Sequence, residues 1–187
     1  MLIIENSTLT DQQAVERILA GDKEVFRVLV ERYRVSLFSF LWRFTNHREE
    51  SEDLTQETFL KAYLNLKRYD PARRFSTWLF TIGHRLAINR WKSLRLKLVE
   101  LEEAHEVRDT GPDPLAVAIG VERREEISRA LALLSEQYRL SLSLYYLSDQ
   151  SIKDIALVTG APESTVKTWL HRGRKALLDV IDLKKVT

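Results

Sequence analysis

The sequence predicts an all-α protein of two small helical domains joined by a flexible acidic linker, and three observations support this prediction. The 187 residues include only 6 glycines and 4 prolines, so there are few sites for the tight turns that a β-sandwich or barrel requires. Apolar residues make up 44% of the chain and recur at three- and four-residue steps, the period of a helix. This period is lost once, over residues 99–114, where acidic residues stand beside two prolines.

The composition also excludes several kinds of chemistry. The chain has no cysteine, which excludes disulfides and thiol catalysis. Its four histidines are never three to five residues apart, so no metal-ligand pair is visible and no cofactor is expected: His47, His84, His105 and His171. Residues 1–6 lack the basic start of a signal peptide, and the longest apolar run, residues 37–42, is too short to span a bilayer. We therefore expect a cytoplasmic protein without direct membrane insertion.

The first domain is expected over residues 22–98, preceded by an N-terminal helix within residues 1–21. Thr10 and Gln13 form a capping box at the start of that first helix, and Gly21 stops it. Asp22 begins a second helix, which Asn46 and His47 break. A third helix is expected from Ser51 or Glu52 to Leu66, and a fourth from the cap Ser76 to about Leu98.

The linker, residues 99–120, is followed by a second domain over residues 121–187. Helices are predicted over residues 115–134, from Ser135 to Leu147, and over residues 152–159. Ser151 and Asp154 form a second capping box, and Gly160 ends the helix that follows it. Pro162 suits the first turn of a last helix that reaches about Leu183.

Charge is unevenly distributed along the chain. The net charge is +7 over residues 22–97 and −5 over residues 98–120, and residues 67–97 hold nine basic residues against Asp70 alone. A charged helix face is usually just solvated, but an imbalance of this size would also concentrate a polyanion near the protein.

The last two helices have the spacing of a helix-turn-helix. One side of the final helix is apolar, and the other side carries basic and hydrogen-bonding residues that suit base edges and phosphates: Lys167, Thr168, His171, Arg172 and Lys175. The alternative is an αα-hairpin whose outer face is merely soluble. Trp169 flanks the apolar side and is expected to be half-buried packing.

Residues 54–92 interleave basic and aromatic residues, as single-stranded DNA binding requires, because bases stack on aromatic rings while cations follow the backbone. Tyr69 and Phe75 are predicted to lie in an exposed loop. Trp78 and Phe80 could equally be core residues, and the spacing places Trp78 mostly inside.

The segment Glu52–Tyr63 (EDLTQETFLKAY), followed by Phe75–Ile82 (FSTWLFTI), closely resembles region 2 of the extracytoplasmic-function (ECF, group 4) sigma factors of the bacterial sigma-70 family. The segment Thr165–Leu177 (TVKTWLHRGRKAL) resembles the recognition helix of their region 4. The resemblance implies a subunit that binds core RNA polymerase, recognises the −10 and −35 promoter elements, opens the DNA and directs transcription of a stress- or signal-responsive regulon. The contacts that it implies with core polymerase are the coiled coil of the largest subunit and the flap, and it also implies an anti-sigma factor as a partner.

The resemblance assigns roles to particular residues. Those matching the positions that dock on the coiled coil of the largest polymerase subunit are Asp53, Gln56 and Glu57. Those matching the part that opens and reads the −10 element are Tyr69, Arg73, Arg74, Phe75, Arg85 and Asn89. Those matching the −35 reader are Lys167, Thr168, His171, Arg172 and Lys175.

The sequence departs from the family pattern in the second domain. Ser135 stands where proline is usual, and Asp149 and Gln150 replace the usual glycine of a turn. Ser141 and Ser143 make a normally aliphatic helix more polar.

Two other classes of function fit the sequence less well. An autonomous helix-turn-helix regulator would explain the last two helices but leaves residues 54–92 unexplained. An enzyme is not expected, because the sequence has no metal-spaced carboxylate cluster, no glycine-rich phosphate loop and no nucleophile–base pair.

Overall fold

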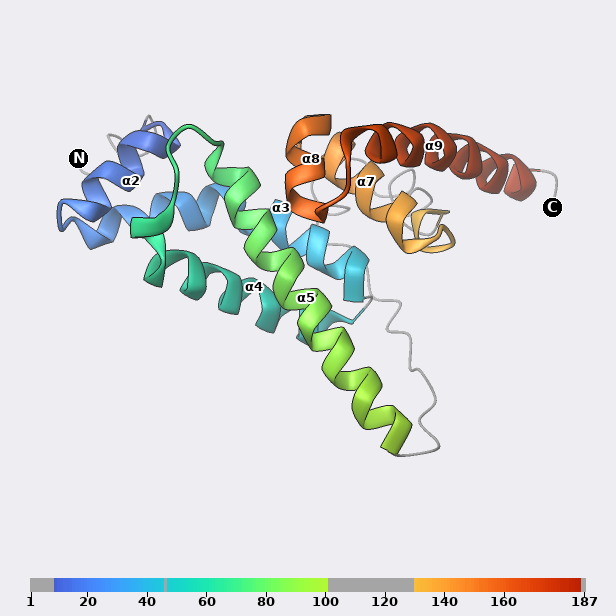
Figure 1. The fold of residues 1–187 in the computed structure, drawn as a ribbon, viewed down its shortest axis with the longest axis horizontal. Helices are drawn as coiled ribbons and strands as arrows, with labels where there is room; N and C mark the ends of the chain where they lie inside the picture. Colours follow the sequence, from blue (N-terminus) through green and yellow to red (C-terminus); the bar gives the residue numbers. More distant parts are fainter. Residues whose placement is uncertain (1–8, 46, 101–129, 186–187) are drawn as a thin grey trace.

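A computed structural model describes residues 9–45, 47–100 and 130–185, with side chains described for residues 9–45, 47–90 and 130–181. All the regular elements in these ranges are helical, as predicted (Figure 1). The first domain consists of α2 (Asp11–Leu19), η1 (Lys23–Val25), α3 (Phe26–Thr45), α4 (Arg48–Leu64), η2 (Leu66–Arg68) and α5 (Phe75–Glu100). The second consists of α7 (Glu136–Leu147), α8 (Ile152–Thr159) and α9 (Glu163–Lys185).

The start of the first helix confirms the predicted capping box. The backbone N–H of Gln13 donates to the Thr10 hydroxyl at 3.2 Å, and the N–H of Thr10 donates to the Gln13 side chain at 2.9 Å. Gly21 then turns the chain in a left-handed conformation, with φ of 111°. Two later helices begin at residues other than those predicted. α4 begins at Arg48 with His47 as its cap, and α5 begins one residue before Ser76, whose hydroxyl instead accepts a hydrogen bond from Gln150.

The core of the first domain lies where α3, α4 and α5 meet. Leu37, Leu41, Leu54 and Leu79 are fully buried there. Gly83 of α5 permits the close contact: a Cβ at this position would lie 3.2 Å from Leu37 Cδ1 and 3.3 Å from Thr58 Oγ1. A side chain at this position would therefore require its neighbours on α3 and α4 to shift.

In the second domain α9 packs on α7 and α8, and the turn between α8 and α9 lies where the sequence predicts it. Gly160 adopts φ of 72° and ends α8, whose start is capped by Ser151 and Asp154 as expected. Gly173 brings α9 against α7, because a Cβ there would lie 3.1 Å from the Cβ of Tyr138. The centre of the domain is apolar: Leu144, Ile155, Val158, Val166 and Leu170.

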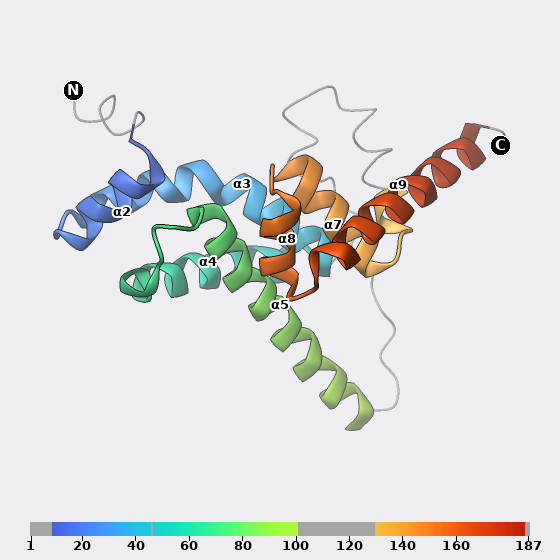
Figure 2. The ribbon, with the colours of Figure 1, turned by 45° about the horizontal axis from the view of Figure 1, so that its top comes forward.

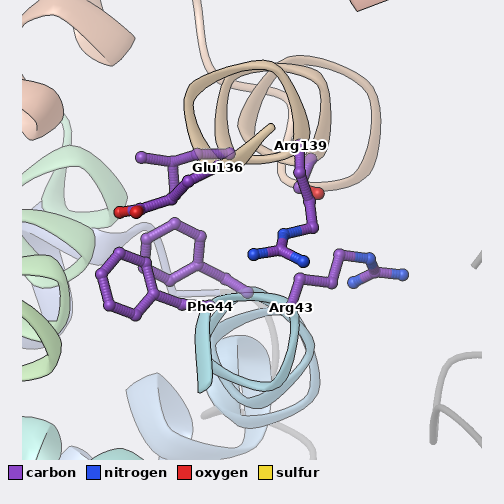
Figure 3. A pocket seen from close by; sticks show the side chains of 7 residues that line it. Arg43, Phe44, Glu136 and Arg139 are labelled. Carbon is purple, nitrogen blue, oxygen red and sulfur yellow. The ribbon is translucent and has the colours of Figure 1, made fainter. Parts of the chain in front are cut away.

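The two domains pack against each other. α7 lies on α3 and α8 lies on α5 (Figures 1 and 2). A narrow pocket remains between α3 and α7, and Figure 3 shows Glu136 and Arg139 of α7 facing Arg43 and Phe44 of α3 across it. The sequence does not decide between a compact and an extended arrangement of the two domains, and in the structure they are in contact. Most of the predicted linker, and most of the helix predicted over residues 115–134, lie outside the described residues.

None of the helices in the described ranges combines the length and apolar character that a membrane span needs. Within the same ranges, no three histidine, aspartate or glutamate side chains are grouped as a metal site would require.

Candidate nucleic-acid interface

The outer side of α9 presents the five residues predicted to read duplex DNA. All five side chains are exposed, and we call them the recognition face: Lys167, Thr168, His171, Arg172 and Lys175. The opposite side of α9 is fixed by Val166 and Leu170, which are 0% and 4% exposed. A helix held by one side and basic on the other can enter a major groove without losing its packing.

Two residues beside the recognition face have their side chains held by contacts with the rest of the domain. Trp169 is partly buried against the apolar core, which confirms its predicted packing role. Arg174 is exposed, and its guanidinium donates to the Tyr146 hydroxyl at 3.2 Å. Because Arg174 is tied back toward α7, it adds positive charge beside the face without being oriented outward with it.

A short loop, residues 69–74, precedes α5 and is closed by its own hydrogen bonds. The Tyr69 hydroxyl donates to the Arg73 carbonyl at 2.6 Å, and the N–H of Ala72 donates to the Asp70 side chain at 2.9 Å. Tyr69 is half-buried, so the prediction that it is exposed is only partly right. Burial is the main reason that the pKa of Tyr69 is raised, followed by the charges of Asp11 and Asp70. Arg73 is exposed at the end of this turn.

The prediction that Phe75 is an exposed loop aromatic is wrong. Phe75 is 1% exposed and is the first residue of α5, where its ring lies 5.6 Å from Tyr69 and 5.7 Å from Trp78. The physical reason is that the ring fills the space between the loop and the domain core. Phe75 therefore supports loop 69–74 from inside and has no free face on which a base could stack.

Further along α5, Arg85 and Asn89 lie one turn apart and are both exposed, as their predicted role in DNA binding requires. Trp78 is only partly buried, less than predicted, and Phe80 is a core residue at 1% exposure.

The polar face of α4 was predicted to dock on a protein. Asp53 and Gln56 are exposed. Glu57 is half-exposed and links α4 to α5, because its carboxylate lies 3.2 Å from the Lys61 ammonium and 3.6 Å from the Arg90 guanidinium. The opposite side of the helix is buried in the core, so this face is presented in a fixed orientation.

Sequence reasoning missed two leucines on the same side of α4. Leu60 and Leu64 are 58% and 69% exposed, and they follow Asp53 and Glu57 at the three- and four-residue steps that line one face of a helix. Leu60 and Tyr63 also line a groove of about 470 Å³ between α4 and the start of α3. The spacing alone could have indicated these residues. We call Asp53, Gln56, Glu57, Leu60 and Leu64 the docking face.

Arg74 differs from its neighbours because it reaches the second domain. Its guanidinium donates to the Asp149 carbonyl at 2.8 Å and lies 3.8 Å from the Asp154 carboxylate. Burial would raise the pKa of Asp154, but hydrogen bonds from Ser151 and Thr77 and the charge of Arg74 together lower it. Asp154 is therefore held ionised against Arg74.

The fold and these surfaces define a class: a two-domain helical protein with a helix-turn-helix in one domain and, in the other, exposed arginines near a loop that carries an aromatic residue. Comparisons with known proteins agree. Residues 29–96 match the family described as sigma-70 region 2, and residues 124–177 match sigma-70, region 4.

Whole-chain comparisons extend the match. The chain is 30% identical to the ECF RNA polymerase sigma factor SigW of Bacillus subtilis over 178 residues, which cover 89% of this chain and 94% of that protein. It is 31% identical to the RNA polymerase sigma-H factor of Pseudomonas aeruginosa, over 89% and 91% of the two chains. A solved structure of the sigma factor RpoE of Bartonella quintana, in complex with the anti-sigma factor NepR, has the same fold, with a TM-score of 0.75, 21% identity and coverage of 84% and 96%. The chain belongs to the ECF sigma factors of the sigma-70 family.

Proposed function

We propose that this ECF sigma factor divides transcription initiation among its three described surfaces. The docking face of α4 binds the coiled coil of the largest subunit of core RNA polymerase. The recognition face of α9 reads the −35 element. Loop residues 69–74, together with Arg85 and Asn89 of α5, contact and help to open the −10 element. Acting with polymerase places the protein in the cytoplasm, and the chain itself has no catalytic role.

The observation that carries this proposal is the recognition face. All five of its members are exposed on one helix whose other side is buried. Cationic side chains in that arrangement suit both the phosphates and the base edges of a duplex.

The docking face supports the requirement for core polymerase. The exposed carboxylate of Asp53 and the half-exposed one of Glu57, beside exposed leucines on one rigid helix, suit a partner helix that offers cations and apolar side chains together. An autonomous helix-turn-helix regulator would have no use for this face. We extend the proposal to an anti-sigma partner because the related Bartonella structure is a complex with one.

Co-purification with bacterial core RNA polymerase tests the proposal. Asp53→Lys should abolish capture of the chain by core, because it places a cation at the centre of the acidic part of the docking face. Glu49→Lys is the matched control, since it is the same reversal on an exposed residue at the start of α4, outside the docking face. Undiminished capture of Asp53→Lys would contradict the docking assignment. Circular dichroism of both variants shows whether the helices are intact.

A further inference from the structure

The functions proposed for the three surfaces leave the first helix, α2, without a role. α2 precedes residues 29–96, which match sigma-70 region 2, and it packs on α3. It also meets η2, the short helix that leads into loop 69–74 (Figures 1 and 2). α2 therefore lies beside the part of the chain that the proposed function assigns to the −10 element.

The start of α2 is tied to α3 by polar contacts. The Asp11 carboxylate accepts hydrogen bonds from the Tyr33 hydroxyl and from the Arg32 guanidinium. Arg32 also donates to the Leu9 carbonyl at 2.6 Å. One carboxylate of α2 thus holds two neighbouring side chains of α3.

Attachment of α2 to the domain does not depend on these polar contacts. Its inner side is apolar and buried, since Ala14, Val15 and Ile18 are 0%, 4% and 7% exposed. Such burial holds an amphipathic helix on its neighbour without directional contacts. What the hydrogen bond between Asp11 and Tyr33 adds is a fixed position for the phenol ring.

The Tyr33 ring supports the loop from beneath. Its centre lies 5.8 Å from that of Phe75, and the Phe75 ring lies 5.6 Å from Tyr69. The Tyr69 hydroxyl closes the loop by donating to the Arg73 carbonyl at 2.6 Å. The charge of Asp11 also reaches the loop, because after burial it is the next cause that raises the pKa of Tyr69. An unbroken series of contacts thus runs from α2 to the loop, and we call its members the loop support: Asp11, Tyr33, Phe75 and Tyr69.

We propose that Asp11 and Tyr33 are positioning residues for the −10 element: they fix the shape of loop 69–74 and so sharpen its preference among bases. Both side chains are partly buried and bonded to each other, so they act through the loop and not by touching DNA. A loop held in one shape discriminates between bases better than a loop that adapts to each. The inference rests on the proposed function for the role of the loop, but the shape of the loop can be measured without DNA.

Hydrogen exchange of the free full-length chain, read by mass spectrometry, tests the positioning. Within the loop, the backbone N–H groups of Ala72 and Arg73 donate to Asp70 at 2.9 Å and 3.0 Å, which protects them from exchange. Tyr33→Phe keeps the ring but removes the hydroxyl. Peptides covering the loop should exchange severalfold faster in this variant than in the parent, because the loop opens more often once its support is loosened.

The aspartates at the two ends of α2 provide a matched control. Asp11→Ala should speed loop exchange as Tyr33→Phe does, whereas Asp11→Asn keeps an acceptor for the Tyr33 hydroxyl and should stay close to the parent. Asp22, just beyond the other end of α2, is also partly buried and pairs with Arg17 at 2.5 Å. Asp22→Ala removes a comparable ion pair outside the loop support, so loop exchange should not change. Thermal melts of the four variants show whether the domain remains folded.

Transcription by core RNA polymerase from promoters randomised across the −10 element tests the consequence for DNA. Tyr33→Phe and Asp11→Ala should reduce the ratio between the best and the worst base at one or more −10 positions about fivefold, as loss of one hydrogen bond predicts. The −35 preference and capture by core should stay as in the parent. A loss of stability alone would lower transcription from every promoter in proportion and leave the base ratios intact.

The two measurements separate the inference from the proposed function. Unchanged loop exchange in Tyr33→Phe would overturn the positioning role and leave the proposed function standing. Equal acceleration by Asp22→Ala would also overturn it, because the effect would then be a general loosening of α2. Faster loop exchange with unaltered base ratios would remove the loop from −10 reading, and with it both that part of the proposed function and this inference.

Discussion

The rings of Phe75 and Tyr33 lie 5.8 Å apart, centre to centre, where the start of α5 meets α3. The Tyr33 hydroxyl donates in turn to Asp11 of α2, and burial, followed by that hydrogen bond, raises the pKa of Tyr33. The loop that precedes α5 is therefore supported from beneath by an aromatic cluster tied to the first helix of the chain.

Phe75→Ala should weaken the whole first domain. Truncating a fully buried phenylalanine costs about 3–5 kcal/mol, so a thermal melt should show a clearly lower transition temperature. Transcription should fall equally on fully paired templates and on templates already mismatched across the −10 element. A variant with a native melt and a defect restored by the mismatched template would show instead that Phe75 stacks on a base.

Lys167→Ala and Arg172→Ala should each weaken −35 recognition by roughly 1–3 kcal/mol if the side chains reach base edges. Neither side chain is buried, so the melting temperature should hardly change. Titration of duplex promoter fragments at several salt concentrations checks this. Equal loss on all sequences with a smaller salt dependence would assign the residue to phosphate contact, and unchanged promoter preference in the double variant would remove α9 from the reading role.

Gly173→Ala should destabilise the second domain although alanine is the better helix former. The helix preference favours alanine by about 1 kcal/mol. The new Cβ, however, would lie 3.1 Å from the Tyr138 Cβ and 3.2 Å from the Leu142 Cδ1, and such overpacking costs about 1–3 kcal/mol. We expect a net loss of roughly 1 kcal/mol in a denaturant melt, with Leu178→Ala on the exposed side of α9 as the control. A variant as stable as the parent would mean that α7 and α9 are further apart.

The sequence was sufficient to predict most of the local structure, because caps and apolar periods are local signals. Both capping boxes, at Thr10 and Ser151, and the left-handed Gly160 stand where they were predicted. Phe75 lies next to a proline-containing loop, and that position in the sequence wrongly predicts an exposed loop residue. Its four-residue step to the buried Leu79 was the signal for the core.

The interdomain packing could not be predicted in the same way. Thr77 and Gln150 are polar residues that, taken along the sequence, resemble ordinary surface positions. They are buried only because two segments more than seventy residues apart meet, and no local pattern encodes that meeting.

His84 should make stability fall on acidification. Burial is the main reason that its pKa is lowered below 6.5, with the charge of Arg85 adding to this and a hydrogen bond to the Val158 backbone of α8 opposing it. The unfolded chain thus binds a proton at His84 more readily than the folded chain does. The contribution of His84 to the free energy of unfolding is therefore fully present above pH 6.5, and it is lost as the pH falls through the lowered pKa of His84 in the folded chain.

Denaturant melts between pH 7.5 and pH 5 measure this loss, since Asp154 titrates below this window. His84→Phe keeps a ring beside Phe40 and Phe44 but cannot titrate, so its stability should change less over the same range. Identical pH profiles for the parent and the variant would show that His84 does not carry the effect.

Transcription from a random promoter library tests the central claim most directly. Bacterial core RNA polymerase is incubated with and without the purified chain, and the transcripts are sequenced from their 5′ ends. We predict start sites that depend on the chain and share one pair of elements near −10 and −35, with the −35 preference lost in the Lys167→Ala/Arg172→Ala double variant. Transcripts that are the same with and without the chain, while it binds duplex DNA stably on its own, would contradict the account.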